Sequence, residues 1–368
     1  MRSAIILIAA LLLFAATAGA RVRYCAGDCD DDNAVTVDEL VAGVNLALGE
    51  AGSCPAFDSS GDQQVTVDEI LAGVNSALAG CPLLDATGCN GGEVLCDRRY
   101  DQVSYPTAHN AMANSDDGFQ APNQAHSISC QLEDGVRALM LDTYQYEGDV
   151  YLCHAECSFL GRRPLVDGLS EIRTFLERHP RDVVSIIFEA YVSAEATAAV
   201  FEQAGLMPYV HTQPLGEPWP TLRQMIDGGR RLVVFSDSDR GAIPWYHYVW
   251  DYAFETHFDN QTPEDFSCAP NRGDPSNSLF ILNHFLTRTV GAPRFAEMVN
   301  HNPLFIDRAR ECMQANDRLP NFVTVDFYDI GDLFEVVREL NRITVAGGFG
   351  WWLEGKSPST SHYPPVTF

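Results

Sequence analysis

The sequence predicts a mixed α/β protein whose larger part is a (β/α) barrel of the TIM type, preceded by a small all-α domain. The first observation is that short β-branched apolar runs alternate with helical segments from about Cys89 onward. Nearly continuous apolar strands separated by helices indicate a parallel sheet that is covered on both faces. The second is the length of this region, which allows enough such units to close a barrel. A doubly wound open sheet is the alternative, and no glycine-rich nucleotide motif supports it.

Residues 1–20 are predicted to be a secretory signal peptide. They read MRSAIILIAALLLFAATAGA, with one arginine, a continuous apolar run and the small residues Ala18-Gly19-Ala20 before the expected cleavage. No later segment is apolar enough to span a bilayer. We therefore expect a secreted, extracellular protein, with the periplasm or cell surface as alternatives and no transmembrane segment after cleavage.

The chain contains 11 cysteines, which agrees with an oxidising compartment. Several lie close together without the partner pairs or histidines of a zinc site, so they predict disulfides whose connectivity stays open. These neighbours are Cys25/Cys29, Cys89/Cys96 and Cys153/Cys157.

The composition is strongly acidic. Fifty Asp and Glu residues oppose 24 Lys and Arg residues, and the formal net charge is −26. Such a surface repels nucleic acid and anionic lipid, so we expect no nucleic-acid partner. It suits a calcium-binding protein.

Residues 21–82 are predicted to form a calcium-binding module, because they contain an internal repeat. DCDDDNAVTVDELVAGVNLALG, from Asp28, recurs as DSSGDQQVTVDEILAGVNSALAG, from Asp58. Each copy begins like a calcium loop, with oxygen ligands at positions 1, 3 and 5 and a bidentate Glu at position 12. The predicted ligands are Asp28, Asp30, Asp32 and Glu39 in the first copy, and Asp58, Ser60, Asp62 and Glu69 in the second. Apolar residues at helical spacing follow each loop.

This repeat resembles dockerin-type and related bacterial paired calcium modules, over residues 24–81. The resemblance implies folding that depends on Ca²⁺ and docking to a cohesin-like protein partner. The chain differs from a typical dockerin in its cysteines and in its missing loop glycines, because position 6 is Asn33 in one copy and Gln63 in the other.

The predicted barrel spans residues 83–368, and many of its strands end in a residue capable of chemistry. In a parallel barrel the carboxyl ends of the strands meet at one mouth, so these side chains are expected to converge. They are His109, Asn110, Asp142, His154, Glu189, Asp237, Asp239, Asn283, His284 and Asp326. Two histidines with carboxylates could hold a metal, or could divide general base and general acid duty across a phosphodiester.

Three blocks of the barrel carry a resemblance to a known family. CNGGEVLCDRRYDQVSYPTAHNAMA, QLEDGVRALMLDTYQYEGDVYLCHAEC and FLERHPRDVVSIIFEAY occur in this order, and LPNFVTVDFYDIGDLFEVVRELN follows later. Together they resemble the catalytic X region of phosphatidylinositol-specific phospholipase C, and most closely the secreted phospholipase-C-like phosphodiesterases. The resemblance covers residues 89 to about 342.

The resemblance implies an activity and a mechanism. The substrate would be a phospholipid or a soluble inositol phosphodiester, whose 2-hydroxyl attacks its own phosphate while His109 removes the proton. His154 would protonate the leaving oxygen, and a cyclic phosphodiester would result. Asp326 would orient one of the two histidines.

The resemblance to calcium-dependent members also implies a Ca²⁺ site formed by Asn110, Asp142 and Glu189. The sequence departs from these members at Met140, where they carry a Glu. Arg162 and Arg163, which follow the second histidine block, are the candidates for binding the substrate phosphate.

Two other functions remain open at this point. One is a glycerophosphodiester- or sphingolipid-type phosphodiesterase on the same barrel, although such enzymes use a Glu-x-Asp metal pair that Met140 interrupts. The other is a calcium-dependent binding protein whose barrel has lost catalysis, against which His109 and His154 argue.

Overall fold

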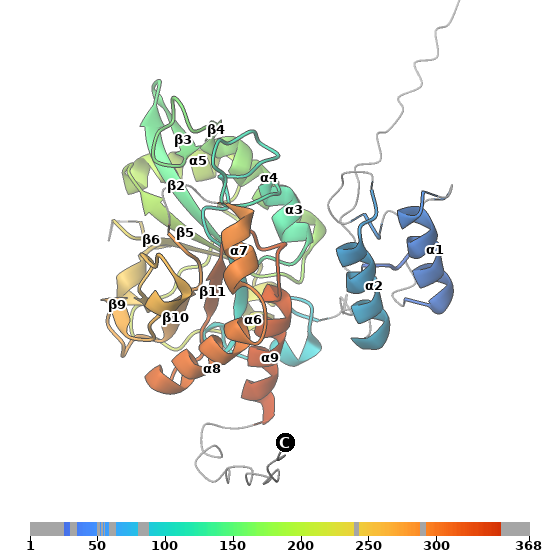
Figure 1. The fold of residues 1–368 in the computed structure, drawn as a ribbon. Helices are drawn as coiled ribbons and strands as arrows, with labels where there is room; N and C mark the ends of the chain where they lie inside the picture. Colours follow the sequence, from blue (N-terminus) through green and yellow to red (C-terminus); the bar gives the residue numbers. More distant parts are fainter. Residues whose placement is uncertain are drawn as a thin grey trace, which may run out of the picture. The chain divides into compact units, whose positions relative to one another are not determined.

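The computed structural model describes residues 26–29, 35–49, 52, 54, 56–58, 64–79, 88–238, 243–287 and 292–346. The chain divides into two compact units, Met1–Leu83 and Leu84–Phe368 (Figure 1). The predicted signal peptide lies outside the described residues. Across the described residues, no helix is long and apolar enough to cross a membrane.

The first unit contains one helix from each repeat, α1 (Val37–Ala47) and α2 (Val67–Ala79). Phe57 is fully buried between the repeats. A Cβ atom added to Gly43 or Gly73 would lie 2.6 Å or 2.4 Å from the Phe57 ring, so both glycines are needed for this packing. The disulfide Cys29–Cys54 fixes the loop that carries Phe57.

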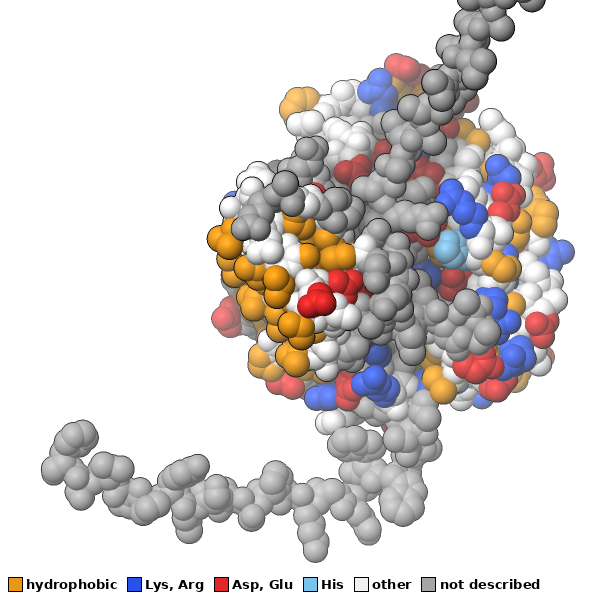
Figure 2. All heavy atoms as spheres, turned by 90° about the vertical axis from the view of Figure 1, so that its right-hand side faces the viewer, with side chains coloured by type: hydrophobic (Ala, Val, Ile, Leu, Met, Phe, Trp, Pro, Cys, Tyr) orange, Lys and Arg blue, Asp and Glu red, His pale blue; other side chains and the backbone are white. Residues whose placement is uncertain are grey.

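The two helices leave apolar side chains exposed at equivalent positions of the repeat, and Figure 2 shows hydrophobic side chains gathered on one face of the molecule. Val37 is 74% exposed and its counterpart Val67 is 70% exposed. The other exposed large apolar residues of this unit are Val41, Val44 and Leu48 on α1, and Leu71 and Leu78 on α2.

The second unit is built on one 11-stranded sheet. Nine of its strands follow the order β7-β6-β5-β2-β1-β11-β10-β8-β9, and the other two are β3, which pairs with β2, and β4, which pairs with β3. The strands of the parallel part are β1 (Tyr105–Ala108), β2 (Ala138–Tyr146), β5 (Val184–Ala190), β6 (Leu232–Ser236), β7 (Tyr246–Tyr248), β8 (Ala253–Thr256), β10 (Leu279–Asn283) and β11 (Phe322–Val325). The antiparallel strands are β3 (Asp149–Cys153), β4 (Arg162–Pro164) and β9 (Pro270–Gly273).

Helices follow the parallel strands, as the sequence predicts. They are α3 (Ile128–Glu133), α4 (Leu165–Arg178), α5 (Ala194–Gln203), α6 (Leu222–Asp227), α7 (Pro293–Val299), α8 (Leu304–Asn316) and α9 (Leu333–Ala346). Helix α4 buries the apolar face that its periodicity predicts, formed by Leu165, Leu169, Ile172, Phe175 and Leu176. The mixed α/β fold with a parallel-rich sheet is therefore confirmed.

The prediction of a closed barrel is wrong. The sheet is curled but open, because within the described residues no ladder joins β7 to β8 or β9. The reason is visible in the pairing of β8, which has β10 on one edge and the antiparallel β9 on the other. Since both edges of β8 are hydrogen-bonded, β7 cannot pair with β8, the next parallel strand along the chain, to close the barrel.

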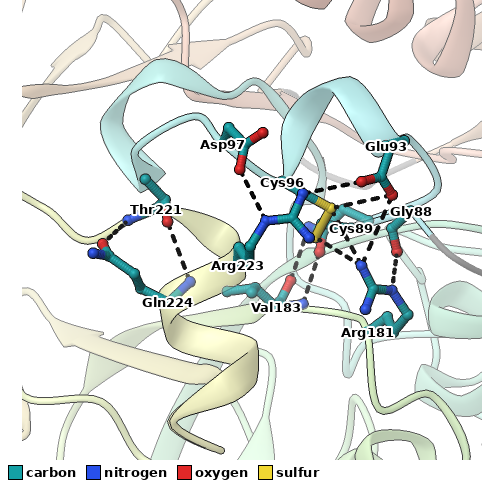
Figure 3. Close-up of a disulfide and its surroundings, with 11 residues drawn as sticks. Gly88, Cys89, Glu93, Cys96, Asp97, Arg181, Val183, Thr221, Arg223 and Gln224 are labelled. Carbon is teal, nitrogen blue, oxygen red and sulfur yellow. Dashed lines mark hydrogen bonds and ion pairs between the residues drawn. A yellow bond between two sulfur atoms is a disulfide. The ribbon is translucent and has the colours of Figure 1, made fainter.

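The amino ends of the strands are closed by a segment that a disulfide stabilises. Cys89–Cys96 links residues before β1, and the side chains of Arg181 and Arg223 surround it (Figure 3). Arg181 Nε donates to Gly88 O at 3.0 Å, and Arg223 Nε donates to Asp97 at 2.9 Å. These contacts tie the segment before β1 to Arg181, which precedes β5, and to Arg223, which lies on α6.

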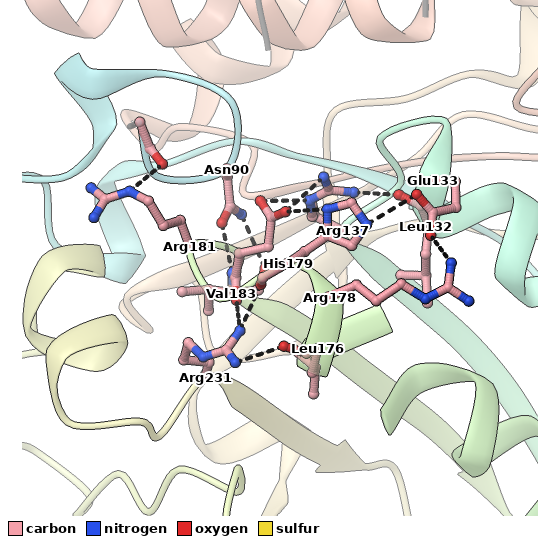
Figure 4. A network of polar contacts seen from close by, with 12 residues as sticks. Asn90, Leu132, Glu133, Arg137, Leu176, Arg178, His179, Arg181, Val183 and Arg231 are labelled. Carbon is pink, nitrogen blue, oxygen red and sulfur yellow. Dashed lines mark hydrogen bonds and ion pairs between the residues drawn. The ribbon is translucent and has the colours of Figure 1, made fainter. Parts of the chain in front are cut away.

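Arg137 belongs to the same end of the sheet, immediately before β2. Its guanidinium makes two 3.2 Å hydrogen bonds to the Asp182 carboxylate and donates to Val136 O. It also donates to Leu132 O (Figure 4). The side chain of Arg137 is 6% exposed and that of Asp182 is 12% exposed. This buried ion pair joins the beginnings of β2 and β5, so Arg137 is structural.

The disulfides agree only in part with the cysteines that are neighbours in sequence. Cys89–Cys96 and Cys153–Cys157 form between neighbours, whereas Cys29 pairs with Cys54 and not with Cys25. Cys268–Cys312 joins segments that are distant in sequence. Among the described residues Cys130 is a free cysteine, and Cys25 lies outside them.

Candidate active site

His109 and Asp326 lie side by side where two neighbouring strands end. Ala108 and Val325 are in register in the parallel pair β1–β11, and the next residue of each strand is His109 or Asp326. The backbone N–H of His109 donates to Val325 O at 2.9 Å, and its Nδ1 lies 2.7 Å from Asp326 Oδ1. Because an ionised carboxylate only accepts, Nδ1 carries a proton, and in the neutral imidazole the lone pair is then on Nε2.

The ring of His109 is held in place by two further contacts. It stacks on Phe285 with ring centroids 3.9 Å apart and an angle of 8° between the planes. The Gln124 amide donates to the carbonyl oxygens of His109 and Val325, which ties together the ends of both strands. The imidazole is therefore preorganised, with Nε2 as the atom left to act on a substrate.

His154 reaches the same mouth by a different route from the one the sequence suggests. It follows β3, which pairs antiparallel with β2, with Thr143 opposite Leu152. Strand β2 extends beyond Asp142, and β3 returns along it, so that His154 lies back at the level of the parallel strand ends. The expectation that His154 ends a parallel strand is therefore wrong. The disulfide Cys153–Cys157 closes the loop around it, and Ala155 adopts a left-handed φ of 62°.

Asn110 connects the two histidines. It has a left-handed φ of 44°, which turns its side chain inward, and it is 7% exposed. Its Nδ2 lies 3.3 Å from His154 Nε2. His154 Nδ1 is buried and has no hydrogen-bond partner among the described residues. Burial lowers the pKa of His154, and the nearby His109 lowers this pKa further.

Asp142 and Glu189, the predicted metal ligands on β2 and β5, are in register. Asp142 is 5% exposed. Burial raises its pKa well above the ordinary value, and the negative charges of Glu189 and Asp237 raise it further. Asp237 follows β6 and accepts a 3.1 Å hydrogen bond from the Ala190 N–H, so it joins this pair. Three carboxylates thus influence one another at the mouth.

These residues fit a cation only in part. Asp142 and Glu189 are in register, burial and the charge of Glu189 raise the pKa of Asp142, and such a pair of carboxylates is a suitable donor set for Ca²⁺. Asn110, however, directs its amide nitrogen to His154, and one Glu189 oxygen accepts from the Tyr191 hydroxyl. Within the described residues, no group of three or more His, Cys, Asp or Glu side chains is placed to hold a metal ion.

The predicted loops of the first unit are described only at their ends. Glu39 Oε2 accepts from the Thr36 N–H at 2.7 Å, and its Oε1 accepts from the Cys29 N–H at 2.7 Å. Glu69 accepts from the Thr66 N–H in the same way. Asp28 and Asp58 are described as well, whereas Asp30, Asp32, Ser60 and Asp62 lie outside the described residues.

The two arginines predicted to bind phosphate have different surroundings. Arg163 forms ion pairs with Asp117 and Glu171, so two carboxylates already compensate its charge. Arg162 is exposed, and its guanidinium lies 4.7 Å from the centre of the Tyr146 ring. Arg162 is therefore the better candidate of the two.

Sequence reasoning missed a cation near the carboxylates. Arg272 of β9 pairs with Glu255 and stacks over Trp250 and Phe258. Burial raises the pKa of Asp237, and the positive charge of Arg272 partly opposes this rise. No signal in the sequence could place it, because Arg272 does not end a parallel strand. His284 shows the opposite error, since it ends β10 but hydrogen-bonds to Val299 O and Arg308 in the core.

The second unit is an α/β fold with a curled, parallel-rich sheet. At the strand ends it carries His109, which Asp326 holds, and His154, and two such histidines are suited to acid–base chemistry. The family model described as PI-PLC X 1 matches residues 95–341. The chain therefore belongs to the family of proteins with the X domain of phosphatidylinositol-specific phospholipase C.

Several curated proteins are similar to this chain. A PI-PLC X domain-containing protein of Arabidopsis thaliana is 31% identical over 67% of this chain and 64% of its own length. An uncharacterized secreted protein of Arthroderma benhamiae is 30% identical, over 70% of this chain and 65% of its own. A PI-PLC X domain-containing protein of the same fungus is 30% identical over 69% of this chain and 90% of its own length. The chain thus spans less than two thirds of the length of the first two relatives.

Solved structures with a similar fold include the phosphatidylinositol-specific phospholipase C of Listeria monocytogenes. The match has a TM-score of 0.47 and 17% identity, and it covers 67% of this chain and 94% of that chain. A mutant of the Staphylococcus aureus enzyme matches with a TM-score of 0.43 and 13% identity, over 63% of this chain and 87% of that chain.

Proposed function

We propose that this protein is a secreted phosphodiesterase of the phospholipase C kind that cleaves an inositol phosphodiester through a cyclic phosphate. The observation that carries the proposal is the His109–Asp326 pair with His154 beside it at the ends of the strands. Membership of the PI-PLC X family supports a phospholipase-C-like activity. The substrate and the roles of the single residues are the proposal.

The geometry supports a division of labour between the histidines. His109 Nε2, held by the bond from Nδ1 to Asp326, takes the proton of the inositol 2-hydroxyl as that oxygen attacks the phosphorus. The bond from phosphorus to the diacylglycerol oxygen breaks, and His154 gives this oxygen a proton. Asp326 stabilises the imidazolium that forms at His109. Water can then open the cyclic product, with the two histidines exchanging roles.

Ca²⁺ is proposed for the pair Asp142 and Glu189, with Asn110 as the third predicted ligand. Bound there, a divalent cation would neutralise charge on the phosphate and on the attacking oxygen. The chain's own contribution is to keep the two carboxylates in register at the mouth. We propose Ca²⁺ for the loops of the first unit as well, and a cohesin-like partner for its exposed apolar helix positions.

Export is proposed for the whole chain. The disulfides of both units and the secreted relative support an extracellular location.

A substrate panel with and without calcium tests the function. We expect the protein to cleave phosphatidylinositol or a soluble inositol phosphodiester, and phosphorus NMR to detect the cyclic phosphate. Thorough chelation is expected to reduce the rate by about tenfold or more, and added Ca²⁺ to restore it.

Each other outcome of the panel has a definite meaning. Cleavage of a glycerophosphodiester or sphingolipid instead would replace the substrate class. A lack of cleavage in every condition would favour a binding protein. A rate that chelation leaves unchanged would remove Asn110, Asp142 and Glu189 from the metal role.

The pH dependence of kcat/KM follows from the lowered pKa of His154. Its folded-state pKa lies below 6.5, mainly because of burial. A general acid must be protonated in the free enzyme, so kcat/KM is expected to fall as the pH rises through this lowered value. A soluble substrate assayed across mildly acidic to neutral pH measures the decline. A rate that increases throughout this range would contradict the role of His154 as the acid.

A further inference from the structure

Asn123 contacts both Asp326, which holds His109, and Asn110, which contacts His154. It is 5% exposed. Its backbone N–H donates to Ala113 O at 2.8 Å, and its carbonyl accepts from the Phe327 N–H at 2.8 Å. Phe327 has a left-handed φ of 48° and directly follows Asp326. The backbone of Asn123 therefore joins the segments that follow β1 and β11.

The side chain of Asn123 has only one orientation that satisfies its neighbours. Its Nδ2 lies 3.1 Å from Asp326 Oδ1, and the nitrogen must face this atom because a carboxylate cannot donate. Its Oδ1 consequently faces Asn110 and accepts from Asn110 Nδ2 at 3.4 Å. Asp326 Oδ1 thus receives one hydrogen bond from Asn123 and one from His109 Nδ1.

The orientation of Asn123 fixes that of Asn110 in turn. With its oxygen directed away, Asn110 presents Nδ2 to His154 Nε2, at 3.3 Å, and Nε2 accepts this bond in the neutral form of His154. The hydrogen bonds therefore diverge from Asn110 Nδ2. One branch passes through the Asn123 amide to the Asp326 carboxylate, and the other ends on His154. Such polar chains hold each member in one arrangement.

We propose that Asn123 is a positioning residue that sets the arrangement of both histidines. By holding Asp326, it keeps His109 in the form with its proton on Nδ1 and Nε2 ready to act. By holding Asn110, it directs the ring of His154. This inference rests on the proposed function, because the two histidines that Asn123 positions are the proposed base and acid.

Asn114 offers a matched control from the same segment. It is fully buried, as Asn123 nearly is, and its side chain bonds to Asp117 and to the carbonyls of Ala111 and Met112. No bond of its side chain reaches Asp326, Asn110 or either histidine in the described residues. Asn114→Ala should therefore lower stability without a specific effect on the site.

The test compares Asn123→Ala, Asn123→Asp and Asn114→Ala. For Asn123→Ala we expect kcat on a soluble inositol phosphodiester to fall about 10- to 100-fold, because misplaced histidines lose part of the rate that general acid–base catalysis provides. KM should change less than about threefold. Asn123→Asp keeps the size and the acceptor toward Asn110 but loses the donor to Asp326. Its kcat should fall at least as far.

Nitrogen-15 NMR of labelled histidines gives a second readout that does not need turnover. In the wild type, His109 is expected to show a protonated Nδ1 and an unprotonated Nε2, and Asn123→Ala should mix the two tautomers. If the wild type cleaves no substrate, the proposed function fails, whereas this signature still decides the role of Asn123.

Three results would overturn the inference. The first is that both Asn123 variants keep the kcat and the tautomer of the wild type. The second is that Asn114→Ala changes the tautomer and kcat as much as Asn123→Ala does. The third is that both Asn123 variants fail to fold while Asn114→Ala folds, which would make Asn123 a structural residue.

Discussion

Replacing His109 by alanine is expected to lower kcat on an inositol phosphodiester by about 10²–10⁴-fold, the usual contribution of a general base. His109 is the histidine whose Nδ1 is bound by Asp326 and whose ring is fixed on Phe285. Without Nε2, the proton acceptor that Asp326 and Phe285 hold in place is lost. Steady-state kinetics with purified protein measure the loss.

His154→Ala should produce a loss of similar size, because it removes the acid for the leaving group. The double variant should be little worse than either single variant, since residues that act together are not additive. His301→Ala is the matched control, because His301 is half exposed and pairs only with Glu297 in the described structure. Full activity in both His109→Ala and His154→Ala would end the acid–base assignment.

The second large effect is expected on stability, from Asp182→Ala. This substitution leaves the buried guanidinium of Arg137 without its carboxylate, and breaking a buried pair in this way costs about 3–5 kcal/mol. Urea-induced unfolding of the variant and the wild type measures the difference in unfolding free energy. The Arg137→Met/Asp182→Leu double variant should recover much of the loss, because it removes both buried charges.

Glu177→Ala is the control for that experiment. Glu177 pairs with Arg173 one turn earlier on α4, and both side chains are well exposed. Such surface pairs contribute about 0.3–0.5 kcal/mol, so its unfolding free energy should stay close to that of the wild type. A loss below about 1 kcal/mol in Asp182→Ala would show that the Arg137 pair does not hold the beginnings of β2 and β5 together.

Half of the candidate site could be predicted from sequence because it depends on a local rule. His109 and Asp326 directly follow strands, and parallel strands end at one edge, so their convergence needs no knowledge of the partner strand. The same rule places Asp142, Glu189 and Asp237 together. It fails for His284, whose side chain turns into the core although its strand ends at the same edge.

The sequence itself determined the alternation of apolar strands and helices, and also the buried face of α4, because periodicity decides which side chains can be buried. Tertiary structure alone decided the open sheet, the return of β3 that delivers His154, the pairing of Arg163 with carboxylates and the place of Asn123. These features depend on which distant segment occupies a hydrogen-bonding edge or faces a charge. Such a choice is made by competition among all segments in the folded chain, and no single stretch of sequence records it.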